Sequence, residues 1–182
     1  MSALPHLSSI FDRLKRGCHL GPDDEPEFSA LCARHAEYAA YFEPLGLTLV
    51  RHERDFFYFE PDNPETVADT LPRIAVFSYI MVDHAANQGR SLEEFIFGQN
   101  FLLTALPHFA LDRYAALMRQ VDMYDMNDLA TLLNHMERIG WIKWAGEDEF
   151  RFLRPFYRVF SQCLAIAQPA QTAPPTAPPA EP

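Results

Sequence analysis

The feature that most constrains the fold is an order of elements that occurs twice along the chain. In each half, helical patterns are followed by two short β-rich runs joined by a polar turn, at Leu47–Arg51 and Phe56–Glu60 and again at Trp141–Trp144 and Phe150–Leu153. This arrangement predicts an antiparallel hairpin in each half. Between the halves, the sequence Pro61-Asp-Asn-Pro64 interrupts helical and strand patterns alike. We therefore expect two small units, each closed by a hairpin.

The helical segments are defined by apolar residues at spacings of three and four, and by residues that begin or end a helix. Ser91-Leu-Glu-Glu94 matches a capping box, which predicts that the serine side chain accepts an amide hydrogen bond at a helix start. The predicted helices cover 7–16, 24–42, 70–86, a segment from Ser91 that carries Phe95–Phe97 and Phe101–Leu103, a segment from Pro107 through Leu117, 125–139 and 155–167.

Helices followed by a hairpin, twice in one chain, are typical of tandem winged-helix domains. We predict an α+β, mainly helical fold with an N-terminal winged-helix domain at 1–62 and a C-terminal one at 63–167. Residues 168–182 are rich in Pro and Ala and contain no aromatic side chain. Because such a segment cannot bury enough apolar surface to offset its ordering entropy, we expect a disordered tail.

The helix predicted at 125–139 has the clearest pattern and leaves a polar stripe on its outer face. Its stripe contains Thr131, Asn134, His135 and Arg138, and the next hairpin carries Lys143 and Arg151 on opposite arms. In helix-turn-helix proteins this face enters the major groove, while neighbouring basic residues contact phosphates. These six residues are our candidate DNA contacts. The alternative is an ordinary solvated helix face and a charged hairpin.

Aromatic residues crowd both hairpins and the segment between them. Four consecutive aromatics at 56–59 imply that both faces of that strand are covered. The cover could be the other winged helix, a second copy of the chain or a peptide of a partner. The candidate partner-binding residues are Phe56, Tyr58, Phe95, Phe97 and Trp144.

The charge of the chain limits its function. A formal net charge of −10 disfavours a protein whose main affinity comes from coating phosphates, although the segment 138–158 is locally richer in bases. The histidines follow no metal-ligand spacing, and no catalytic motif or phosphate loop is present in the sequence, so we expect no metal, no cofactor and no enzymatic activity. With no apolar window near the roughly 18 residues of a membrane span, we expect a cytoplasmic protein without membrane contact.

Several short motifs resemble the MukE/MksE family of bacterial condensin subunits. They are Leu14-x-x-Gly-x-His19-Leu-Gly, Leu47-Thr-Leu-Val-Arg51, Phe56-Phe-Tyr-Phe-Glu-Pro61 and Leu133-Asn-His-Met-Glu-Arg138-Ile-Gly140, with the Trp-rich hairpin that follows. The resemblance covers roughly residues 7 to 160. The short chain is more similar to MksE than to MukE. Arg138 matches one of two adjacent family arginines on the recognition helix, and Glu137 replaces the other.

The resemblance implies a non-enzymatic adaptor that forms a homodimer and binds a kleisin subunit similar to MksF. Through the kleisin it would join an SMC ATPase similar to MksB, hold DNA in the assembled complex and lie on the nucleoid. Such complexes act in chromosome partition and DNA condensation, or in plasmid defence with a nuclease subunit similar to MksG. The main alternative is a stand-alone winged-helix transcription regulator, which would bind specific DNA by itself.

Overall fold

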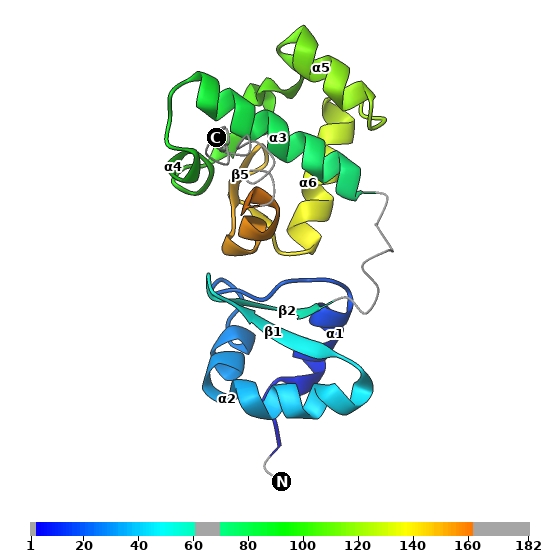
Figure 1. The fold of residues 1–182 in the computed structure, drawn as a ribbon, viewed down its shortest axis with the longest axis vertical. Helices are drawn as coiled ribbons and strands as arrows, with labels where there is room; N and C mark the ends of the chain where they lie inside the picture. The colour runs from blue at the N-terminus through cyan, green and yellow to red at the C-terminus, as the bar shows by residue number, and fades with distance from the viewer. Residues whose placement is uncertain (1–2, 61–69, 162–182) are drawn as a thin grey trace, which may run out of the picture.

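The computed structural model describes residues 3–60 and 70–161, here called the first and second units (Figure 1). The predicted division near residue 62, the end of the last predicted helix and the tail at 168–182 lie outside these residues. The fold is α+β and mainly helical, as predicted.

The first unit contains two helices and a hairpin. Leu20, in the segment after the first helix, exchanges two backbone hydrogen bonds with Phe57 and so extends the hairpin by one residue on a third strand. In the hairpin, Thr48 pairs with Glu60 and His52 with Phe56. The elements are α1 (Leu7–Lys15), α2 (Glu27–Phe42), η1 (Glu43–Leu45), β1 (Thr48–His52) and β2 (Phe56–Glu60).

The second unit packs its helices around a small sheet with strand order β3-β5-β4. All neighbouring strands are antiparallel. Its elements are α3 (Leu71–Asn87), α4 (Leu92–Phe97), β3 (Phe101–Leu102), η2 (Leu103–Ala105), η3 (Pro107–Phe109), α5 (Asp112–Arg119), α6 (Met126–Arg138), β4 (Ile142–Trp144), β5 (Glu149–Phe152) and η4 (Arg154–Phe156). A helical segment follows at 157–161.

Two separate hydrophobic cores lie in the two units. One is built around Leu14, Leu31 and Phe57, and the other around Phe77, Leu133 and others of the second unit. Figure 1 shows the units stacked along the long axis, with the hairpin β1–β2 on the side of the first unit that faces the second. The second face of this hairpin is therefore available to pack against the second unit.

Three predictions about local structure are wrong. Phe101–Leu103 does not continue a helix: α4 ends at Phe97, with Gly98 at its C-cap, and Phe101 pairs with Phe150 in the sheet. A side chain at Gly98 would place its Cβ 2.5 Å from the carbonyl oxygen of Glu94. Ser91 lies at the N-cap of α4, but its side chain makes no capping hydrogen bond. Pro107 opens the 3₁₀ helix η3, and Leu111, which has an extended backbone, separates it from α5.

Candidate functional site

The helix α6 is fixed at both ends, which sets the orientation of its outer face. Asp125 caps the N-terminus by accepting hydrogen bonds from the amide nitrogens of Asn127 at 2.8 Å and Asp128 at 3.0 Å. After the C-terminus, Gly140 has a φ of +78°, which favours glycine. The inner face is anchored by buried side chains, namely Leu129, Leu132, Leu133 and Met136.

Three of the four candidate residues on α6 are exposed: Thr131, Asn134 and Arg138. His135 is half-buried, and its Nδ1 lies 3.3 Å from Nη2 of Arg138. Burial, together with the guanidinium of Arg138, lowers the pKa of His135 below its ordinary value. Arg138 therefore carries the positive charge of this face at neutral pH.

The two basic residues of the hairpin β4–β5 differ in their surroundings. Lys143 and Arg151 are paired across the strands. Lys143 is exposed and, within residues 3–60 and 70–161, has no acidic partner within ion-pair distance. Arg151 forms an ion pair with Asp23 of the first unit, with 2.5 Å between Nη2 and Oδ1. The structure thus leaves Lys143 free to meet a ligand and offsets the charge of Arg151.

Trp144 connects the hairpin to α6. Its indole Nε1 donates a hydrogen bond to Oδ1 of Asn134 at 3.1 Å, and its backbone amide donates to Oε1 of Glu137 at 3.3 Å. The half-buried ring also packs edge-on against Phe150. These contacts hold the hairpin against α6, so the side chains of both elements form one continuous surface.

The candidate partner-binding residues of the first hairpin are packed within the chain. Phe56 is fully buried, and its ring lies 5.9 Å from the imidazole of His19. Tyr58 is half-buried, with the guanidinium of Arg158 4.0 Å from its ring centroid. Phe56 thus packs against the first unit, whereas Tyr58 is contacted by the second unit, which is one of the covers considered for this strand.

The candidate aromatics of α4 are also packed within the chain. Phe95 is 5% exposed and packs edge-on against Phe101. Phe97 is half-buried and stacks on Tyr157 with 3.9 Å between the ring centroids. A partner would therefore reach the edges of Tyr58, Phe97 and Trp144 more readily than the rings of Phe56 and Phe95.

His19 lies at the centre of the junction between the units. Its backbone amide donates to the carbonyl oxygen of Ile139 at 3.0 Å. Its Nδ1 lies 3.2 Å from Nε1 of Trp141, and its Nε2 lies 2.8 Å from Nη1 of Arg158. Burial and the neighbouring Arg158 lower the pKa of His19 to about 3, so the imidazole is neutral. Sequence reasoning placed His19 in a family motif and gave it no role.

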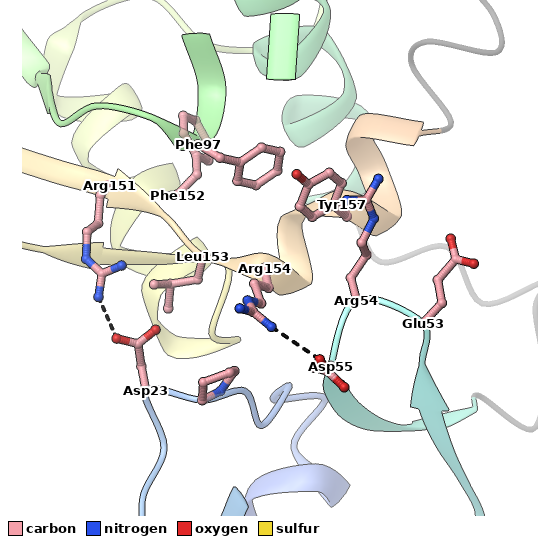
Figure 2. Close-up of a pocket in the computed structure, with 11 residues that line it drawn as sticks. Asp23, Glu53, Arg54, Asp55, Phe97, Arg151, Phe152, Leu153, Arg154 and Tyr157 are labelled. Atoms are coloured by element: carbon pink, nitrogen blue, oxygen red, sulfur yellow. Dashed lines mark hydrogen bonds and ion pairs between the residues drawn. The ribbon is translucent and has the colours of Figure 1, made fainter. Parts of the chain in front are cut away.

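A polar cleft of about 600 Å³ lies beside this junction, between the units (Figure 2). Its arginines are paired with acids across the junction: Arg151 with Asp23, and Arg154 with Asp55 at 3.5 Å. Arg54, which also lines the cleft, forms an ion pair with Glu93 of α4 at 3.1 Å. Because these pairs are solvent-exposed, each contributes only about 0–1 kcal/mol to holding the units together.

A smaller notch of about 130 Å³ opens on the candidate DNA face. It is lined by residues of α6 and by the N-terminal end of α3, which the sequence had not connected with this face. The lining residues are Thr70, Arg73, Asp128, Thr131, Leu132, His135 and Arg138.

Comparison with protein families identifies the chain. A family model described as "Condensin complex protein MksE" matches residues 5–164. The chain belongs to the MksE family. The match spans both hydrophobic cores and both candidate surfaces of this MksE protein, which is accordingly a condensin complex subunit. No curated protein matches it.

Two further observations concern the described part of the MksE chain. None of its helices is long and apolar enough to cross a membrane. No group of three or more His, Cys, Asp or Glu side chains within residues 3–60 and 70–161 is arranged to hold a metal ion.

Proposed function

We propose that this protein is a non-enzymatic adaptor that binds the kleisin of its condensin complex and contributes a small DNA-contacting surface. In this proposal the two units are winged-helix domains, at 1–62 and 63–167, followed by a disordered tail at 168–182. The protein forms a homodimer, and the kleisin, similar to MksF, connects it to an SMC ATPase similar to MksB. The complex lies in the cytoplasm on the nucleoid.

The observation that carries the DNA part is the continuous surface of α6 and the hairpin β4–β5. On this surface Thr131 and Arg138 are exposed on a capped helix, and Lys143 is exposed on the adjoining strand. A helix face beside a basic hairpin is suited to a groove and its flanking phosphates. Asn134 and His135 complete the face, while Arg151 contributes when its pairing with Asp23 opens.

The net charge of −10 supports an adaptor over a free-standing regulator. A surface with two free bases neutralises few phosphates, so the affinity for DNA is weak until the other subunits add contacts. Tyr58, Phe97 and Trp144, with Phe56 and Phe95 behind them, are the proposed kleisin-binding aromatics. The complex acts in chromosome organisation or in plasmid defence, the latter with a nuclease subunit similar to MksG.

The double substitution Arg138→Glu with Lys143→Glu tests this proposal. In the assembled complex it should reduce DNA retention at physiological salt by at least about tenfold, because two phosphate contacts become repulsive. Binding of the kleisin should be unchanged. Equal loss of DNA and kleisin binding would indicate misfolding, and unchanged DNA retention would contradict the proposed surface. Sequence-specific binding of DNA by the isolated chain would instead favour a transcription regulator.

A further inference from the structure

The notch on the α6 face contains an arginine that comes from a different helix. Arg73 lies in the first turn of α3, is half-buried and lines the notch together with Arg138. Its Nε donates a hydrogen bond to the carbonyl oxygen of Val121 at 3.1 Å. This bond fixes the guanidinium group and leaves its terminal nitrogens available for a ligand.

Arg73 and Arg138 in the notch form no ion pair with a described acid, unlike most arginines at the junction between the units. Within residues 3–60 and 70–161, no carboxylate lies within 4.0 Å of either guanidinium. By contrast, Arg54, Arg151 and Arg154 are each paired with an acid. Two uncompensated guanidinium groups at one small cavity favour an anion with several oxygen atoms.

The other groups that line the notch are compatible with an anion. Thr70 and Thr131 bring hydroxyl groups that can donate hydrogen bonds. Within residues 3–60 and 70–161, Asp128 is the one acid among the lining residues, and its Oδ2 already accepts the amide hydrogen of Tyr124 at 2.7 Å. The formal charge of the described lining residues is therefore positive, with His135 neutral. The buried side chain of Leu132 closes the notch against the core.

We propose that this notch binds one backbone phosphate of DNA, held between Arg73 of α3 and Arg138 of α6. The inference rests on the proposed function, because it is the α6 face that brings DNA to the notch. It adds a contact from a helix outside the recognition surface. A phosphate held at this point would set the depth and register of α6 in the groove without reading a base.

The salt dependence of DNA binding tests the notch. The full chain, with and without its kleisin, is titrated with a labelled DNA duplex from low to physiological salt. Each neutralised phosphate contributes about 0.9 to the slope of log affinity against log salt concentration. Arg73→Gln should lower this slope by only part of that amount, because Arg138 still contacts the phosphate, and Arg73→Lys should restore it. The matched control is Arg90→Gln, which removes the same charge roughly 25 Å away, just beyond the far end of α3.

A double variant distinguishes one shared phosphate from two separate ones. If Arg73 and Arg138 hold the same phosphate, Arg73→Gln with Arg138→Gln should lower the slope by about 0.9 in total. A loss of about 1.8 would mean two phosphates and would overturn the shared notch. The proposed phosphate site is also wrong if Arg73→Gln changes the salt slope no more than Arg90→Gln does, while Arg138→Gln and Lys143→Glu weaken DNA binding. If none of these substitutions changes DNA binding, the proposed DNA surface fails as well. Thermal unfolding followed by circular dichroism checks that each variant is folded.

Discussion

His19 is buried in its neutral form, in which Nδ1 can donate to the carbonyl oxygen of Ile139 at 3.2 Å while Nε2 accepts from Arg158. The indole of Trp141 and the guanidinium of Arg158 approach its two ring nitrogens. An imidazolium would carry a proton on Nε2 as well, and this proton would face the donor Nη1 and the positive charge of Arg158. The junction therefore requires the uncharged form, which is why the pKa of His19 falls to about 3.

The low pKa of His19 predicts a pH dependence of stability. In the unfolded chain His19 titrates near 6.5, so below this pH the unfolded state binds a proton that the folded state excludes down to about pH 3. Between these values His19 should lower the free energy of unfolding by about 1.4 kcal/mol per pH unit of acidification. The free energy of unfolding, measured by urea denaturation at several pH values, should fall less steeply with acidification in His19→Asn than in the wild type. Parallel slopes would contradict the neutral junction.

The same variant should also be less stable at neutral pH. The shorter asparagine side chain does not reach the position of Nε2, so the guanidinium of Arg158 loses its acceptor in a desolvated site. The expected cost is about 1–3 kcal/mol. The measurement is the free energy of unfolding in urea at pH 7.5, and a change below about 0.5 kcal/mol would mean that water replaces the imidazole without loss.

The ion pair between Arg151 and Asp23 predicts unequal roles for the two basic residues of the hairpin. Lys143→Gln should weaken DNA binding by the assembled complex several-fold, whereas Arg151→Gln should change it less, since that charge is already offset. Asp23→Asn, which frees Arg151, should strengthen binding. Fluorescence anisotropy with a labelled duplex compares the three variants. An equal effect of the two basic substitutions would show that the ion pair opens when DNA binds.

At the scale of elements, the end of α6 joins the two units. Gly140 ends the helix with a left-handed backbone, and an added Cβ would lie 2.7 Å from the carbonyl oxygen of His19. The backbone hydrogen bond from His19 to Ile139 depends on this close approach. The glycine thus serves both as the stop of α6 and as the contact point for the first unit.

Comparing Gly140→Ala with Gly89→Ala separates the cost of a left-handed backbone from the cost of losing the close approach to His19. Both glycines have positive φ, but Gly89, just beyond the end of α3, has no atom within 4 Å of an added Cβ. Gly89→Ala should therefore cost only the backbone strain, about 1 kcal/mol. Gly140→Ala should cost more and should loosen the junction, which small-angle scattering would detect as a larger radius of gyration. Equal costs with unchanged scattering would show that the His19 backbone yields easily.

The sequence predicted those elements that are marked by residues within the element or directly beside it. The hairpins at Thr48–Glu60 and 142–152 and the helix α6 follow from alternation, an aspartate cap and a terminal glycine. The strand β3 was missed because its two residues are ordered by pairing with β5, far along the chain. For the same reason His19 and Arg73 were not connected with the candidate surfaces: their partners lie 120 and 48 residues away.

At the scale of the whole molecule, two small cores are joined by a polar and aromatic junction. Most of the aromatic rings that suggested a partner-binding surface pack within the chain. The half-buried rings of Tyr58, Phe97 and Trp144 are the ones that another chain can still contact. The acidic first unit neutralises bases of the second through Asp23 and Asp55. Among the described residues of α6 and the hairpin β4–β5, this pairing leaves Arg138 and Lys143 as the bases without an acidic partner.

The most direct test of the adaptor account is binding of the purified full chain to the middle region of its kleisin. Titration calorimetry and co-elution should show a stable complex that forms without DNA and without the SMC ATPase. The complex should persist in the Arg138→Glu, Lys143→Glu variant, whose DNA surface is reversed in charge. Failure of the folded wild-type chain to bind the kleisin would contradict the account.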